Sequence, residues 1–108
     1  MIVQDFVWTQ NDVGILQISM EPSIPIGGRA LEWSLMHRLG GSGFLIKLSS
    51  SGFDGVSGIT ITDSGLGRFN IALNSGDMSS GYGVYAYRAR FIDNPQITVS
   101  EGSVLLEP

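Results

Sequence analysis

The chain contains no cysteine, which excludes disulfide bonds, thiolate metal sites and thiol catalysis. Proline is also rare, at 4 of 108 residues, whereas glycine is abundant at 15. Glycine costs a helix about 1 kcal/mol relative to alanine, so this composition indicates many turns and few helices.

Positive charge and long apolar runs are scarce as well. The 6 basic residues are scattered singly among 10 acidic ones, and the formal net charge is −4. Neutralising phosphates requires clustered Lys and Arg, so we expect no nucleic-acid partner. No apolar run approaches the roughly 20 residues that span a bilayer, and residues 1–6 do not resemble a secretory signal. We therefore expect one soluble domain, residues 1–108, with no signal peptide and no membrane partner.

Apolar and polar residues alternate along most of the chain, and alternation at every second position predicts β-strands. The alternating segments are 2–9, 13–20, 44–48, 59–62, 69–73 and 83–91. Turn residues separate them, and a further turn is expected at Glu101-Gly102. Seven or eight short strands with turns at this spacing are typical of an all-β fold in which two antiparallel sheets pack as a sandwich.

The alternation also predicts the hydrophobic core. Trp33 is expected to anchor it from a central strand. Lys47 is expected to point outward, and Phe44, Ile46 and Leu48 inward. The inward-facing residues expected from the second half of the chain are Phe69, Ile71, Leu73, Tyr85, Tyr87, Ala89 and Phe91.

Residues 30–39 allow two interpretations. Three leucines recur at every fourth position and Gly40 follows them, which suits a helix that ends at a glycine. Trp33 alternates with its polar neighbours Glu32 and Ser34, which suits a half-buried strand. Because the segment lies among strands, we favour the strand.

Asp63-Ser64-Gly65 follows an apolar strand and resembles the catalytic signature of retroviral-type aspartic proteases. Those enzymes are homodimers of about this chain length, in which two such aspartates share a proton. Leu66 departs from the small residue that usually follows in that family. The same tripeptide is typical of a hairpin turn in which Gly65 supplies a positive φ. We favour the turn, and a protease that uses Asp63 is the remote alternative.

The sequence predicts no catalytic, metal-binding or cofactor-binding residue. His37 is the only histidine, and no other ligand-type residue lies at metal-binding spacing from it. The glycine run 40–43 lacks the Gly-Lys-Ser/Thr that completes a phosphate-binding loop. We therefore expect a protein that is not an enzyme and that needs no cofactor.

Aromatic and arginine side chains provide the candidates for binding. Arg88 and Arg90 alternate with the tyrosines and are expected on a solvated or partner-facing surface, where they would also protect exposed sheet edges. Trp8 and Tyr82, with Tyr85, Tyr87 and Trp33, could stack on sugars, but aromatic rings more often fill a core or a subunit contact, and we favour that interpretation. A glycan- or receptor-binding sandwich is therefore an alternative function.

The order of these elements resembles a known family. Residues 5–12 lead into an apolar strand, and a proline-containing link, 25–28, precedes the strand of Trp33. A turn with glycine and apolar alternation, 61–73, is followed by Gly-x-Tyr-x-Tyr at 83–87 and by Glu-Gly-x-apolar at 101–104. This layout is similar to that of the immunoglobulin-like modules of tailed-phage structural proteins, such as the amino-terminal domain of baseplate upper proteins.

The resemblance covers nearly the whole chain and implies an immunoglobulin-like antiparallel β-sandwich of seven or eight strands. It further implies a structural or assembly module of a phage or prophage particle, in the tail, baseplate or neck, without enzymatic activity. The expected partners are other copies of the chain or neighbouring virion proteins, and homo-oligomerisation is a hypothesis. The expected location is the virion, or the bacterial cytoplasm before assembly.

Overall fold

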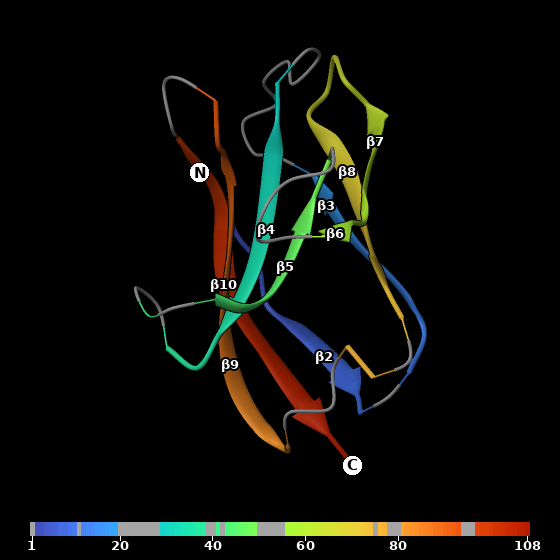
Figure 1. Cartoon of the computed structure of the whole chain (residues 1–108), viewed down its shortest axis with the longest axis vertical. Helices are drawn as coiled ribbons and strands as arrows, with labels where there is room; N and C mark the ends of the chain where they lie inside the picture. The colour runs from blue at the N-terminus through green and yellow to red at the C-terminus, as the bar shows by residue number, and fades with distance from the viewer. Residues whose placement is uncertain are drawn as a thin grey trace.

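A computed structural model describes residues 2–10, 12–19, 29–38, 41, 43–49, 56–74, 76–77, 81–93 and 97–108. Regular structure within these residues is entirely β, which confirms the all-β prediction (Figure 1). The strands are β1 (Ile2–Val3), β2 (Phe6–Thr9), β3 (Gly14–Ser19), β4 (Leu31–Met36), β5 (Gly43–Leu48), β6 (Val56–Ser57), β7 (Ile59–Asp63), β8 (Arg68–Leu73), β9 (Gly83–Phe91) and β10 (Thr98–Glu107). The ambiguous segment 30–39 thus contains a strand, β4, as favoured. The link 25–28 and residues 40 and 42 of the glycine run lie outside the described residues.

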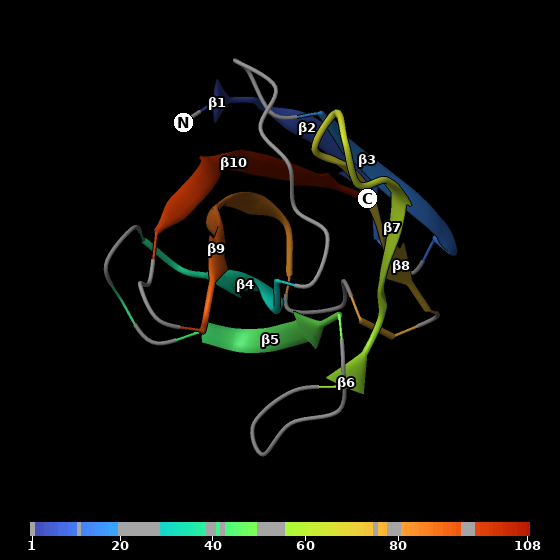
Figure 2. The same ribbon diagram turned by 90° about the horizontal axis from the view of Figure 1, so that it is seen from above.

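The strands form two sheets (Figure 2). Sheet A has the order β1-β10-β9-β4-β5-β6, and β2 also pairs with β10. Sheet B has the order β3-β8-β7. Most pairs are antiparallel, as predicted, but β1 and β2 run parallel to β10, and β6 runs parallel to β5. Alternation within a segment carries no information about the direction of its partner, so the sequence did not indicate these parallel pairs.

The two sheets are connected along both sides of the molecule. Between β6 and β7, the Gly58 N–H donates to the Leu48 carbonyl of sheet A at 2.9 Å. The Gly58 carbonyl accepts from the Ala72 N–H of sheet B at 2.8 Å. On the other side, a Cβ added to Gly14 of β3 would lie 3.0 Å from the indole of Trp8 in β2, so this glycine lets the two strands approach.

The core lies between the inner faces of the sheets. Trp33 of β4 is fully buried, and its ring stacks on that of Tyr87 with 6.1 Å between the centroids. The residues of β8 and β9 that were predicted to face inward are buried in the same cluster: Phe69, Ile71, Leu73, Tyr85, Tyr87, Ala89 and Phe91. The predicted core of the second half of the chain is therefore confirmed.

Strand β5 departs from its predicted orientation. Lys47 lies opposite Trp33 in the register and is only 2% exposed, so the prediction that it points outward is wrong. Its charge is neutralised inside the molecule by Asp77, with Nζ and Oδ2 2.8 Å apart. The register of β4 and β5 shifts at Phe44, which is 39% exposed, and this bulge changes the face on which the following residues lie.

Two predicted turns need correction. Asp63-Ser64-Gly65 does open the turn between β7 and β8, where Asp63 Oδ1 accepts the Leu66 N–H at 3.1 Å. The glycine that adopts a positive φ there, 70°, is Gly67 rather than Gly65. Glu101-Gly102 forms no turn, because it lies inside β10.

Candidate interaction surface

The outer face of sheet A carries an apolar row that crosses three strands. Val7 of β2, Leu105 of β10 and Val84 of β9 lie side by side in the register. They are 62%, 37% and 65% exposed. The end of β2, the end of β10 and the start of β9 meet near the C-terminus in Figure 1. Contiguous exposed apolar side chains mark interaction sites more often than isolated ones do.

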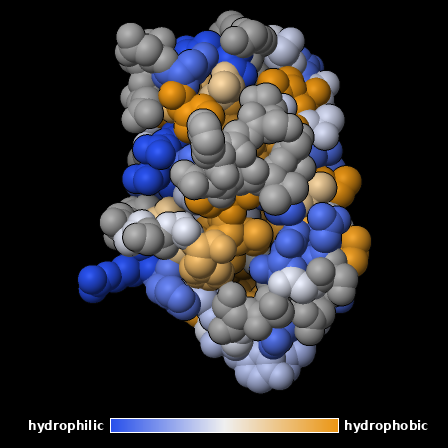
Figure 3. Space-filling view, viewed as in Figure 1, coloured by the Kyte–Doolittle hydropathy of each residue, from blue (hydrophilic) through white to orange (hydrophobic). Residues whose placement is uncertain are grey.

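Other exposed apolar residues lie elsewhere on the surface. Phe44 and Leu66, for example, belong to β5 and to the turn after β7. Figure 3 shows hydrophobic side chains near the middle of the face that contains β4 and β5, with hydrophilic ones on both sides. The row on β2, β10 and β9 is distinct because its members are paired in the register.

A charged pair lies on the same face, four residues after Val84 on β9 and four residues before Leu105 on β10. Arg88 and Glu101 are opposite each other in the register. The Nε atom of Arg88 is buried and has no hydrogen-bond partner. Within the described ranges, neither the guanidinium of Arg88 nor the carboxylate of Glu101 forms an ion pair.

The predicted binding residue Arg90 is in a different situation from Arg88. Its Nε lies 3.0 Å from Oε1 of Glu32 on β4, so its charge already has a partner. Both arginines belong to β9, which has β10 on one side and β4 on the other. The prediction that Arg88 and Arg90 protect a sheet edge is therefore wrong, because β9 is a central strand.

The two aromatic candidates differ in exposure. Tyr82 lies directly before β9 and is 66% exposed. Trp8 is half-buried and packs against the core. Trp33, Tyr85 and Tyr87 are buried, so they do not contribute to a sugar-stacking platform on the surface.

The residues considered for catalysis and metal binding have structural partners. Asp63 is held in the turn by the Leu66 N–H. The ring of His37 lies 4.7 Å from that of Phe44 and 5.5 Å from that of Tyr85. In the part of the chain that the structure describes, no cluster of three or more His, Cys, Asp or Glu could hold a metal ion. No helix in that part is long and apolar enough to cross a bilayer.

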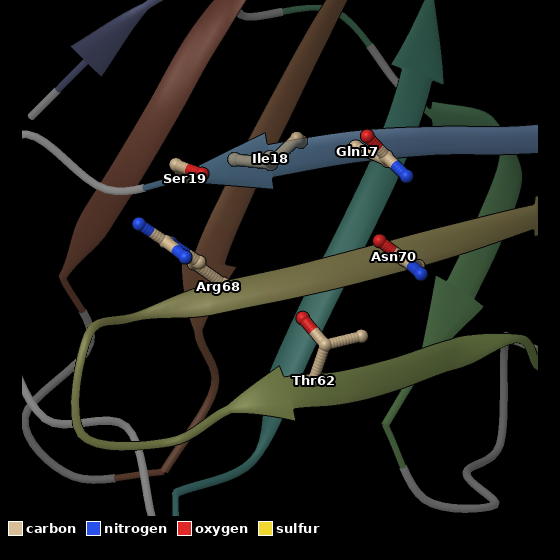
Figure 4. A pocket seen from close by; sticks show the side chains of 6 residues that line it. All are labelled: Gln17, Ile18, Ser19, Thr62, Arg68 and Asn70. Carbon is tan, nitrogen blue, oxygen red and sulfur yellow. The ribbon is translucent and has the colours of Figure 1, made fainter.

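Sheet B has an open depression of about 310 Å³ on its outer face (Figure 4). Gln17 and Asn70 are neighbours across β3 and β8, and so are Ser19 and Arg68. Arg68 has no ion-pair partner among the described residues. The lining contains this single cation and no aromatic ring, so it suits a small anion better than a sugar. The lining residues are Gln17, Ile18, Ser19, Thr62, Arg68 and Asn70.

Sequence reasoning found Arg88 but missed the rest of this face. The alternation of 83–91 places Val84 on the same side as Arg88, and this signal was available. Leu105, Val7 and Glu101 join them only through the pairing of β10 with β9 and β2.

A scan against models of protein families finds no match to this chain, and a search of curated proteins finds no similar sequence.

Proposed function

We propose that this protein is an immunoglobulin-like β-sandwich that serves as a structural module of a phage or prophage particle and acts through protein–protein contacts. The strand order supports the immunoglobulin-like assignment. In such folds one sheet contains strands G, F, C and C′ and the other contains B, E and D. The orders β10-β9-β4-β5 and β3-β8-β7 correspond to these. The buried Trp33 on β4 corresponds to the tryptophan that such domains carry on strand C.

The observation that carries the structural role is the outer face of sheet A. An apolar row, Val7, Leu105 and Val84, is exposed there beside the unpaired Arg88. Apolar side chains at the centre and arginine are both features of protein interfaces. The face would therefore be buried against another protein of the particle, while sheet B and the core maintain the shape of the module.

Purified particles provide the test. Particles would be induced from the strain whose genome carries this reading frame and analysed by quantitative mass spectrometry. We expect peptides of the chain at a fixed ratio to the major tail protein. Deleting the gene should yield non-infectious or incomplete particles, and a wild-type copy should restore infectivity where a Val84→Asp copy does not. Infectious particles that lack the chain would contradict the proposal.

A further inference from the structure

We propose that the partner of this face is a second copy of the chain. The two copies are related by a two-fold axis that runs parallel to β9 and β10 and lies outside the outer face of sheet A, above the line midway between the two strands. The inference rests on the proposed function for the role of the face, and it deepens that function by naming the partner. The observation behind the inference is that each outward residue of β9 is chemically complementary to its cross-strand neighbour on β10.

A two-fold axis in this position places each outward residue of β9 opposite its own cross-strand neighbour on β10 of the other copy. Val84 and Leu105 are such neighbours, and Arg88 and Glu101 are another pair. In the dimer, Val84 therefore faces Leu105 of the second copy, and Arg88 faces Glu101 of the second copy. Each contact occurs twice because the interface is symmetric.

The side chains between the two pairs allow close approach. Ala86 and Ser103 form the register row that separates the apolar pair from the charged pair. Both side chains are small, which favours close packing of the two sheets at this row, and the exposed Asp5 carboxylate lies beside Ser103, with Oδ1 3.1 Å from Ser103 Oγ. Along the strands, the cross-strand pairs of β9 and β10 are thus apolar, then small, then charged. Each pair can pack against the same pair of a second copy in which the positions of β9 and β10 are exchanged.

The charges explain why a second copy fits better than an unrelated protein. Arg88 and Glu101 are adjacent in one chain, yet neither has an ion-pair partner among the described residues. An acidic partner would satisfy Arg88 but would bring like charge to Glu101, and a basic partner would do the reverse. A second copy satisfies both, and such local matching opposes the repulsion between two chains of net charge −4.

Sedimentation velocity over a concentration series tests this arrangement. The wild-type chain should dimerise, and Arg88→Glu and Glu101→Arg should each weaken the dimer about tenfold or more, because like charges then face each other. An equimolar mixture of the two variants should recover the dimer, because in the mixed pair every reversed charge faces its opposite. Arg68→Glu makes the same charge change on the outer face of sheet B and should leave association unchanged.

Several results would overturn the inference. These are a monomer at all concentrations, a dimer that tolerates both single reversals, or a mixture that fails to associate. If a charge reversal prevents folding, as seen by circular dichroism, Arg88→Gln and Glu101→Gln replace it, and both should still weaken the dimer. A monomer that is nevertheless present in particles contradicts only the dimer. A dimer that is absent from particles contradicts only the proposed function.

Discussion

Lys47 is a buried cation whose partner lies inside the molecule. Its Nζ is 2.8 Å from Oδ2 of Asp77, and the two side chains are 3% and 20% exposed. The same oxygen accepts the Asn74 N–H at 2.7 Å, so the ion pair links β5 to the end of β8. Removing one member of a buried pair leaves an uncompensated charge, which is much more costly than the loss of an exposed pair.

Lys47→Met should therefore lower the free energy of unfolding by about 3 kcal/mol, as measured by urea denaturation. Glu32→Gln is the matched control, because it breaks the pair with Arg90, whose side chain is 30% exposed. That control should cost less than about 1 kcal/mol. Combining Lys47→Met with Asp77→Asn should recover part of the loss, since no buried charge then lacks a partner. Equal losses in the two single variants would count against this account.

Tyr87 connects the core to the N-terminal segment. Its hydroxyl donates to the Gln4 carbonyl at 2.6 Å and lies 3.1 Å from Oγ of Ser100. Burial raises the pKa of Tyr87 above the ordinary value of 10.0. The unfolded chain therefore loses this proton at lower pH than the folded chain does, and stability falls as the pH rises through the interval between the two pKa values.

Tyr87→Phe should lower stability by about 1–2 kcal/mol near neutral pH, because it leaves the Gln4 carbonyl without its donor and the Ser100 hydroxyl without its hydrogen-bond partner. The stability of the variant should not fall at alkaline pH through the ionisation of Tyr87. The difference in free energy of unfolding between the wild type and the variant should therefore shrink between about pH 8 and about pH 11. Urea denaturation at both pH values measures the difference. Tyr82→Phe alters an exposed ring and should behave like the wild type. A deficit that stays constant with pH would refute this role of burial.

At the scale of elements, β10 organises sheet A, because β1, β2 and β9 all pair with it. Gly102 lies in β10 where the backbone of Gln4 crosses, and a Cβ at this position would collide with the Gln4 carbonyl. The glycine is therefore needed for close approach of two chain segments. A sequence pattern cannot distinguish this use of glycine from a turn, which is why the turn predicted at Glu101-Gly102 is wrong.

Gly102→Ala should destabilise the protein by about 3 kcal/mol, because neither backbone can move without breaking the pairing of β1 and β2 with β10. Gly65→Ala is the control, since the nearest atom to a Cβ there, Asp63 Oδ1, is 3.7 Å away. Urea denaturation should show a change below about 0.5 kcal/mol for this control. Hydrogen exchange should show loss of protection in residues 2–9 of Gly102→Ala. Unchanged protection would contradict the assignment of Gly102 as a crossing point.

Other elements show which structural features are predicted by sequence patterns within a single segment. The hairpin of β7 and β8 was predicted from its turn residues, and the inward faces of β8 and β9 were predicted from alternation. Strand β5 was predicted with the wrong orientation, because the bulge at Phe44 and the ion pair of Lys47 depend on β4 and on Asp77. Alternation within a segment thus predicts the buried face of a strand correctly where its pairing with the neighbouring strand contains no bulge.

At the scale of the whole molecule, association through sheet A would link stability to concentration. A ligand or partner that binds only the folded chain raises its apparent stability by mass action. The midpoint of thermal unfolding should therefore rise with protein concentration for the wild type. The midpoint of Arg88→Glu should rise less with concentration than that of the wild type, because its dimer is weaker, whereas Arg68→Glu should follow the wild type. Calorimetry over a roughly hundredfold range of protein concentration measures the midpoint of thermal unfolding. Identical behaviour of the two variants would exclude this face as the interface.

Three features of this protein follow from its amino-acid sequence alone: the chain is all-β, Trp33 is buried, and β8 and β9 face inward with their apolar residues. These features depend on alternation and turn residues, which are properties of short segments. The sequence does not show that β2 runs beside β10, and thus that Val7 joins Leu105 and Val84 on one exposed face; this is seen only in the folded chain. Strand pairing depends on contacts between segments far apart in the chain, and the pattern within a strand does not specify its neighbour.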